Sequence, residues 1–152
     1  MLKRGLLVAG LIFLLDQATK ILMLEVVMVP PRLIEVSSFF NLVIVWNRGV
    51  SFGLLSNMDW GPWPLVALSG GVVAGLFVWL ARTKERWLGL ALGLVIGGAL
   101  GNAIDRIVFG AVFDFLDLHV AGYHWPAFNV ADAAISLGVV AIVADSLFGR
   151  RG

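Results

Sequence analysis

The sequence contains no cysteine, and only 14% of its residues are charged. A chain without cysteine cannot form disulfide bonds, a thiolate nucleophile or the cysteine ligands of zinc and iron–sulfur sites. The net charge is +1 and no basic block suited to nucleic acid is present, so nucleic acid is not an expected partner. The two histidines, His119 and His124, form no H-E-x-x-H motif and are interpreted as loop residues. No metal or other cofactor is predicted.

Hydrophobic residues make up 60% of the 152-residue chain. Soluble domains contain about 45–50% apolar and about 25% charged residues. A soluble domain of this size has too high a surface-to-volume ratio to bury so much apolar surface. The composition therefore predicts one integral membrane domain over residues 1–152.

Four apolar segments are long enough to cross a bilayer, which takes about 20 residues. The predicted helices span about residues 5–26, 60–81, 87–107 and 126–147. The first segment resembles a secretory signal, with Lys3 and Arg4 before an apolar run. Because no small-residue cleavage site follows, it is interpreted as a retained helix.

Basic residues in short loops indicate orientation, because they favour the cytoplasmic side. With four spans, all the basic clusters fall on one side, which predicts cytoplasmic termini and outer loops at about 27–59 and 108–125. Residues 39–46 are rich in strand formers. The predicted fold is a membrane all-α bundle of four transmembrane helices, with a small extracytoplasmic β-element in the first outer loop. The basic clusters that predict the orientation consist of Lys3, Arg4, Arg82, Lys84, Arg86, Arg150 and Arg151.

Glycines recur at four-residue spacing within two of the predicted helices. Gly71 and Gly75 form one G-x-x-x-G motif, and Gly93, Gly97 and Gly101 form two overlapping ones. Small residues at this spacing let helix backbones approach closely in lipid. We therefore expect both groups to pack against neighbouring helices.

Ionisable side chains inside a membrane span cost roughly 2.5–3.5 kcal/mol each on insertion scales. Given the helix directions, three polar groups converge in the outer half of the bilayer, each on one helical face. Asp132 follows an apolar start of its helix without an adjacent cation, which favours a functional role. The groups are Asp16, Thr19 and Lys20; Asn102, Asp105 and Arg106; and Asn129 and Asp132.

Structural roles compete with functional ones for most of these residues. Asp16 and Lys20 have the i,i+4 spacing of an ion pair that neutralises itself within the bundle. Asp105 and Arg106 could mark the membrane interface, where charges cost little. Asn102 and Asn129 could provide hydrogen bonds between helices.

A cluster of carboxylates in a poorly solvated site suggests acid–base catalysis, because two close carboxyl groups share one proton. The ionised member can activate water while the protonated member polarises a carbonyl. Asp114 and Asp117 are both candidates for the partner of Asp132, and spacing does not distinguish them. A Ser136–Lys20 nucleophile pair fits less well, because Ser136 lies deeper than Asp132 and no G-x-S-x-G motif exists.

Four groups of residues together resemble the lipoprotein signal peptidases, the signal peptidase II family. Their order, their spacing and the four-span topology match that family over nearly the whole chain. Two departures are present: Val50 and Ser51 replace two alanines, and Ala133 replaces a frequent serine. The groups are Asp16-Gln17-Ala18-Thr19-Lys20; Asn47-Arg48-Gly49-Val50-Ser51-Phe52-Gly53; Gly101 to Arg106 with Val112-Phe113-Asp114-Phe115; and Pro126 to Asp132.

The resemblance implies an intramembrane aspartic endopeptidase of the bacterial inner membrane. It implies cleavage of prolipoproteins just before a diacylglyceryl-modified cysteine, inhibition by globomycin-type cyclic peptides and no metal. It assigns the catalytic pair to Asp114 and Asp132. It gives supporting or substrate-binding roles to Asp16, Lys20, Asn47, Gly49, Phe52, Asn102, Asp105, Arg106 and Asn129.

Two other functions use the same residues differently. In a small proton- or cation-coupled transporter the carboxylates would form a relay, which predicts polar residues at successive depths. A scaffold subunit without chemistry has little need of Asp132 in apolar surroundings. The chain itself is expected to act as a monomer, since four helices can suffice alone.

Overall fold

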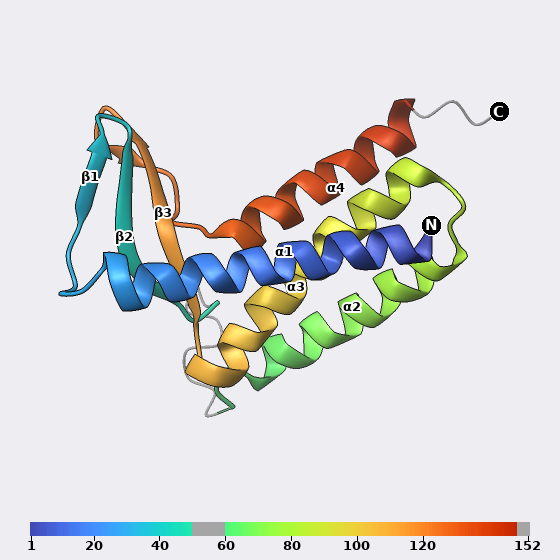
Figure 1. Cartoon of the computed structure of the whole chain (residues 1–152), viewed down its shortest axis with the longest axis horizontal. Coiled ribbons are helices and arrows are strands. Elements are labelled where there is room, and N and C mark those ends of the chain that lie inside the picture. The colour runs from blue at the N-terminus through green and yellow to red at the C-terminus, as the bar shows by residue number, and fades with distance from the viewer. Residues whose placement is uncertain (50–59, 149–152) are drawn as a thin grey trace.

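The computed structural model describes residues 1–49 and 60–148, and its long helices confirm the predicted membrane bundle (Figure 1). Within this part of the chain, four helical segments are long and apolar enough to cross a membrane. The helix α1 continues into a π-helical turn, Met23–Val27. The four helices are α1 (Leu2–Leu22), α2 (Trp63–Arg82), α3 (Arg86–Phe109) and α4 (Val130–Phe148).

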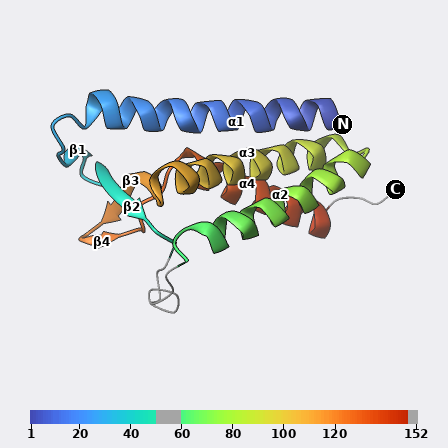
Figure 2. The same ribbon diagram turned by 90° about the horizontal axis from the view of Figure 1, so that it is seen from below.

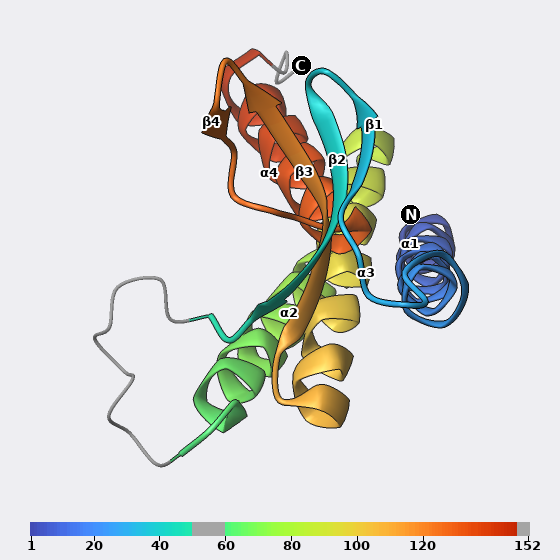
Figure 3. The ribbon, with the colours of Figure 1, turned by 90° about the vertical axis from the view of Figure 1, so that its left-hand side faces the viewer.

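The helix α3 is the central element of the bundle. Eleven of its 24 residues are buried, whereas Leu80 is the one buried residue among those described in α2. Viewed from the sheet end, α1 and α4 lie on different sides of α3 (Figure 3). The other three helices therefore direct most of their surface outward, where lipid replaces protein as the apolar environment.

The glycines of α3 bring the neighbouring backbones into contact. A Cβ atom on Gly93 or Gly97 would lie 2.5 Å from a carbonyl oxygen of α1, that of Gly5 or Ala9 respectively. Among the described residues, nothing lies within 4 Å of a Cβ placed on Gly71 or Gly75. The prediction of close packing is confirmed for α3 and wrong for α2, because the α2 glycines lie on an exposed face of the bundle.

We expect Gly97→Ala to destabilise the bundle, because the added methyl group forces α1 away from α3. Overpacking of this kind costs about 1–3 kcal/mol. Gly75→Ala is the matched control, since it adds the same methyl group in open space and should leave stability unchanged or raise it. Thermal unfolding in detergent measures both. Equal melting temperatures for the two variants would contradict the packing argument.

An antiparallel sheet with strand order β1-β2-β3-β4 lies at one end of the bundle. The first outer loop supplies two strands, as predicted, but the second outer loop supplies the other two, which was not predicted. Antiparallel pairing between β2 and β3 runs from Phe40 opposite Leu118 to Asn47 opposite Val112. The strands are β1 (Ile34–Ser37), β2 (Phe40–Asn47), β3 (Val112–Val120) and β4 (Tyr123–His124).

The sheet lies opposite the end that carries the N-terminus and the α2–α3 connection (Figures 1 and 2). The helix α4 begins at Val130 rather than near residue 126, because Phe128 is hydrogen-bonded to β3. The Phe128 N–H donates to the Leu116 carbonyl at 3.0 Å, and the Leu116 N–H donates back at 2.9 Å. The end of α3 and the segment that leads into α4 therefore meet the strand β3 at the sheet end.

Candidate active site

Two aspartates, Asp114 on β3 and Asp132 on α4, are held by one asparagine. The side-chain amide of Asn129 donates to Asp114 Oδ1 at 2.7 Å, and its backbone N–H donates to Asp132 Oδ2 at 3.2 Å. In return, Asn129 Oδ1 accepts from the backbone N–H of Asp132 at 2.9 Å. Asn129 and Asp114 are fully buried and Asp132 is half-buried, so the structure brings these two predicted carboxylates into one poorly solvated hydrogen-bond network.

A second asparagine, Asn102 on α3, also belongs to this network. Its Nδ2 donates to Asp132 Oδ1 at 2.7 Å, and its Oδ1 accepts from Asn129 at 3.2 Å. Arg106, one turn later, donates from Nη1 to the Asn102 carbonyl at 3.3 Å. Asn102 therefore connects α3 to both α4 residues, and the interpretation of Asn102 and Asn129 as hydrogen-bonding residues between elements is confirmed.

The end of β2 supplies a third contact to Asp114. Asn47 Nδ2 donates to Asp114 Oδ2 at 3.0 Å, and Asn47 Oδ1 accepts from the Gly49 N–H at 2.8 Å. Gly49 adopts a φ of +76°, and a Cβ there would collide with Leu65 of α2, so both backbone and space require glycine. Phe52, also predicted to contribute, lies outside the described residues, as do Val50 and Ser51.

A cleft of about 490 Å³ opens onto Asp114 between β2 and the segment that precedes α4. Asp114 is the member of the pair that lines this cleft, while half-buried Asp132 lies outside its lining. The cleft therefore lies directly beside Asp114, at the edge of the buried network. The cleft is lined by Val45, Trp46, Asn47, Arg48, Asp114, Pro126 and Ala127.

Burial, and to a smaller extent the negative charge of Asp132, raise the pKa of Asp114 from its ordinary value of 3.8 to about 6. Hydrogen bonds from Asn47 and Asn129 act in the opposite direction, because they favour the carboxylate. An aspartate with a pKa near 6 exchanges its proton close to neutral pH. This is the property that acid–base catalysis requires.

The raised pKa of Asp114 predicts a pH-dependent stability cost. Below pH 4 the carboxyl is protonated in both folded and unfolded chains, and above pH 6 it is ionised in both. Between these values only the unfolded chain releases the proton, so the cost of the buried charge grows as pH rises, to about 3 kcal/mol. We expect the stability of the Asp114→Asn variant relative to wild type to improve between pH 4 and pH 7, measured by melting temperature. A pH-independent difference would contradict this shift.

A buried ion cluster of Asp16, Lys20 and Asp105 lies beside the network that holds the two aspartates. Lys20 Nζ contacts Asp16 Oδ2 at 2.8 Å and Asp105 Oδ2 at 2.7 Å, and all three side chains are at most 4% exposed. The predicted Asp16–Lys20 ion pair is therefore confirmed. The alternative that Asp105 simply marks the membrane interface is wrong, because this carboxylate is buried between α1 and α3.

The ion cluster also binds backbone groups of the elements around it. Asp16 Oδ1 accepts from the Ala131 N–H at 2.9 Å, and Asp105 Oδ2 accepts from the Phe113 N–H at 3.2 Å. Both donors adjoin a candidate catalytic residue, Asp132 or Asp114, so the cluster positions the two backbones that carry the pair. Gln17, which donates to Asp105 at 3.0 Å and to Asp16 at 3.1 Å, was not singled out from the sequence. Its position within the Asp16–Lys20 motif was the available signal.

The alternative nucleophile pair and one member of the predicted polar groups do not fit this geometry. Lys20 is occupied by two carboxylates, and Ser136 lies on an exposed face of α4, so a Ser136–Lys20 nucleophile pair is not assembled. The Thr19 hydroxyl donates to the Leu15 carbonyl of its own helix at 2.9 Å and does not join the cluster.

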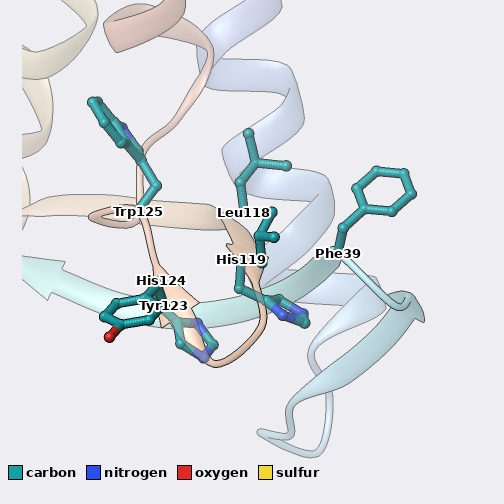
Figure 4. Close-up of a pocket in the computed structure, with 7 residues that line it drawn as sticks. Phe39, Leu118, His119, Tyr123, His124 and Trp125 are labelled. Atoms are coloured by element: carbon teal, nitrogen blue, oxygen red, sulfur yellow. The ribbon is translucent and has the colours of Figure 1, made fainter.

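Asp117 occupies a different environment from Asp114. Its carboxylate accepts from Asn41 at 2.9 Å and contacts His124 Nδ1 at 2.9 Å, and the bond from His124 lowers its pKa. The His119 and His124 rings stack with centroids 4.9 Å apart, beside a pocket at the tip of the β3–β4 hairpin (Figure 4). Within residues 1–49 and 60–148, no group of three or more metal-ligating side chains is assembled.

Comparison with known proteins places these features in a family. The family model for signal peptidase (SPase) II matches residues 8–148. A lipoprotein signal peptidase of Methylobacterium radiotolerans is 50% identical over 149 residues, covering 95% of this chain and 86% of that protein. A lipoprotein signal peptidase of Burkholderia ambifaria is 44% identical over 144 residues, covering 93% and 86%. A bacterial membrane enzyme solved by the in meso method at 1.9 Å resolution is 29% identical, with a TM-score of 0.81 over 96% of this chain and 93% of that one.

Proposed function

The chain belongs to the signal peptidase II family, and from this premise we propose that it is a lipoprotein signal peptidase that cleaves with Asp114 and Asp132. The observation that carries the proposal is the shared hydrogen bonding of both carboxylates to Asn129. Two carboxyl groups tied to one residue, Asp114 through the side chain of Asn129 and Asp132 through its backbone N–H, share a proton more easily in a poorly solvated site than they carry two charges. This is the protonation state that an aspartic peptidase uses.

In the proposed mechanism the two carboxyl groups hold a water molecule at the cleft. The ionised aspartate takes a proton from this water, and the resulting oxygen attacks the scissile carbonyl carbon. The protonated aspartate gives its proton to the carbonyl oxygen, which forms a tetrahedral diol. Collapse of the diol breaks the C–N bond, and the departing nitrogen takes a proton from the aspartate that acted first as the base. One diol hydroxyl returns its proton to the other aspartate, which leaves a carboxylic acid and restores the starting protonation state.

The polar neighbours of the pair have positioning roles in this proposal. Asn47, Asn102 and Asn129 donate to the carboxylates, which fixes their orientation toward the cleft. Lys20 contributes through the ion cluster, which holds the backbones of Phe113 and Ala131. Preorganised donors and charges of this kind stabilise a transition state without reorganising during the reaction.

The proposed substrates are diacylglyceryl-modified prolipoproteins, cleaved just before the lipidated cysteine. The protein acts in the bacterial inner membrane as a multi-pass protein and, we propose, as a monomer with both termini in the cytoplasm. The basic residues near the end opposite the sheet support this orientation. The pair of aspartates then lies near the outer leaflet, where the cysteine and its lipid are presented after export.

The test of this function is incubation of the purified protein with a lipidated prolipoprotein, with and without globomycin. We expect release of the signal peptide, loss of release with the inhibitor, and no release from the same substrate without its lipid. Persistent failure to cleave any lipidated substrate would contradict the proposal.

The transporter alternative requires polar groups at successive depths of the membrane. Among the described residues, the buried polar side chains of the helices all lie toward the sheet end: Asp16, Lys20, Asn102 and Asp105. Such an arrangement supports a one-sided site rather than a pathway. Ion flux in proteoliposomes without peptide cleavage would favour the transporter.

A further inference from the structure

An apolar cavity of about 380 Å³ lies in the half of the bundle away from the sheet. Three helices form its walls, and none of its lining side chains is charged. The cavity is separate from the candidate active site, because Ala141 lies nine residues along α4 from Asp132, roughly 13 Å along the helix. Its lining residues are Val8 of α1, Trp87, Leu90, Ala91 and Leu94 of α3, and Leu137 and Ala141 of α4.

The cavity arises because α1 and α4 are joined at one end only. At the sheet end, the bond between Asp16 Oδ1 and the Ala131 N–H ties the two helices together. Toward the N-terminus of α1 they diverge, as Figures 1 and 2 both show. Gly93 of α3 lies against the α1 backbone at Gly5, whereas Gly138 of α4 lies against the α3 backbone at Ala91. The two helices therefore pack on different parts of α3, and Leu90 and Leu94 of α3 line the space between them.

Basic side chains stand at the end of this cavity. Arg4 precedes Val8 by one helical turn, and Arg86 precedes Leu90 by one turn, so each shares a helix face with a lining residue. Both arginines are exposed, and neither forms a salt bridge within the described part of the chain. Asp145 follows Ala141 by one turn and is the acidic group on this rim. Lys3, Arg82 and Lys84 add further positive charge at the same end of the bundle, beside Glu85.

We propose that this cavity binds an acyl chain of an anionic phospholipid, whose phosphate is held by Arg4 and Arg86. The apolar walls offer water no partners but fit a hydrocarbon chain. Basic pockets between helices on the cytoplasmic side of a membrane suit anionic headgroups. A second copy of this chain is a poorer occupant, because it would bring the same basic residues against this rim. In the proposed orientation the cavity faces the cytoplasmic leaflet, so the lipid would come from that leaflet. This part of the proposal depends on the orientation and not on the catalytic assignment.

The test is native mass spectrometry of the detergent-purified protein with added phosphatidylglycerol or with phosphatidylcholine of the same chains. We expect one tightly retained phosphatidylglycerol and weaker binding of phosphatidylcholine. Ala141→Phe fills the cavity and should remove both lipids, and Leu94→Trp provides an independent blocking variant. The double variant Arg4→Gln/Arg86→Gln should weaken phosphatidylglycerol binding roughly thirtyfold and phosphatidylcholine binding much less, because choline already balances the charge of that phosphate.

Ala74→Phe on the exposed face of α2 is the matched control and should bind lipid like the wild type. Cleavage of lipidated substrate by each variant verifies its fold and separates this proposal from the catalytic one. Retention of phosphatidylglycerol by both blocking variants would overturn the proposal. Equal binding of the two lipids, or a dimer in place of bound lipid, would also overturn it.

Discussion

Replacing either Asp114 or Asp132 by asparagine is expected to abolish cleavage of a lipidated prolipoprotein. An amide cannot take a proton from water or return one to the carbonyl oxygen, and positioned acid–base catalysis contributes roughly 10²–10⁴-fold to a rate. Because the two carboxyl groups act as a unit, the double variant should be no worse than either single one. The measurement is single-turnover release of the signal peptide by purified variants in detergent.

Asp117→Asn is the matched control for this experiment. It makes the same chemical change on the same strand, but Asp117 is bonded to Asn41 and His124 rather than to the candidate pair. We expect its rate to stay within a few-fold of wild type. The assignment of the pair is wrong if a folded Asp114→Asn or Asp132→Asn variant turns over near the wild-type rate. It is equally wrong if Asp117→Asn alone removes activity.

Replacing Lys20 by methionine is expected to produce the largest loss of stability of any single substitution considered. Methionine retains most of the side-chain volume but leaves the carboxylates of Asp16 and Asp105 facing each other without a cation. Removing one partner of a buried ion pair costs about 3–5 kcal/mol. The melting temperature in detergent should fall accordingly, and folded protein should be recovered in lower yield.

A control and a rescue variant separate charge from packing at Lys20. Lys84→Met removes an exposed lysine and should change stability by less than about 0.5 kcal/mol. Adding Asp105→Asn to Lys20→Met removes one of the two uncompensated charges and should recover part of the lost stability. If the double variant is no more stable than Lys20→Met alone, the loss does not come from unpaired carboxylates.

Much of the bundle was predictable from the sequence because the bilayer restricts the choices. An uncharged run such as residues 60–81 satisfies its backbone in lipid only as a helix or in a closed barrel. The expected alternation of helix directions then placed Asp16, Asp105 and Asp132 at the same end. The family resemblance added Asp114, which the spacing of Val112-Phe113-Asp114-Phe115-Leu116-Asp117 had left open.

The central strand β3 was not predictable in the same way. A strand is stable only when paired, and the partner of β3 is β2, more than 60 residues earlier in the chain. That pairing also separates Asp114 from Asp117, because residues an odd number apart on a regular strand face opposite sides. Asn129 illustrates the same limit: its amide meets Asp114 only because β3 and the start of α4 lie side by side.

The sequence by itself determined which four segments are apolar enough to cross a membrane and at which end of the bundle the costly polar groups lie. Both follow from hydropathy along the chain, which needs no knowledge of neighbours. Only the tertiary structure decided which carboxylates share one asparagine, which glycines touch a backbone and where Lys20 finds its two partners. These contacts span about 3 Å, so they depend on helix rotation and strand register, and a shift of one residue would separate them.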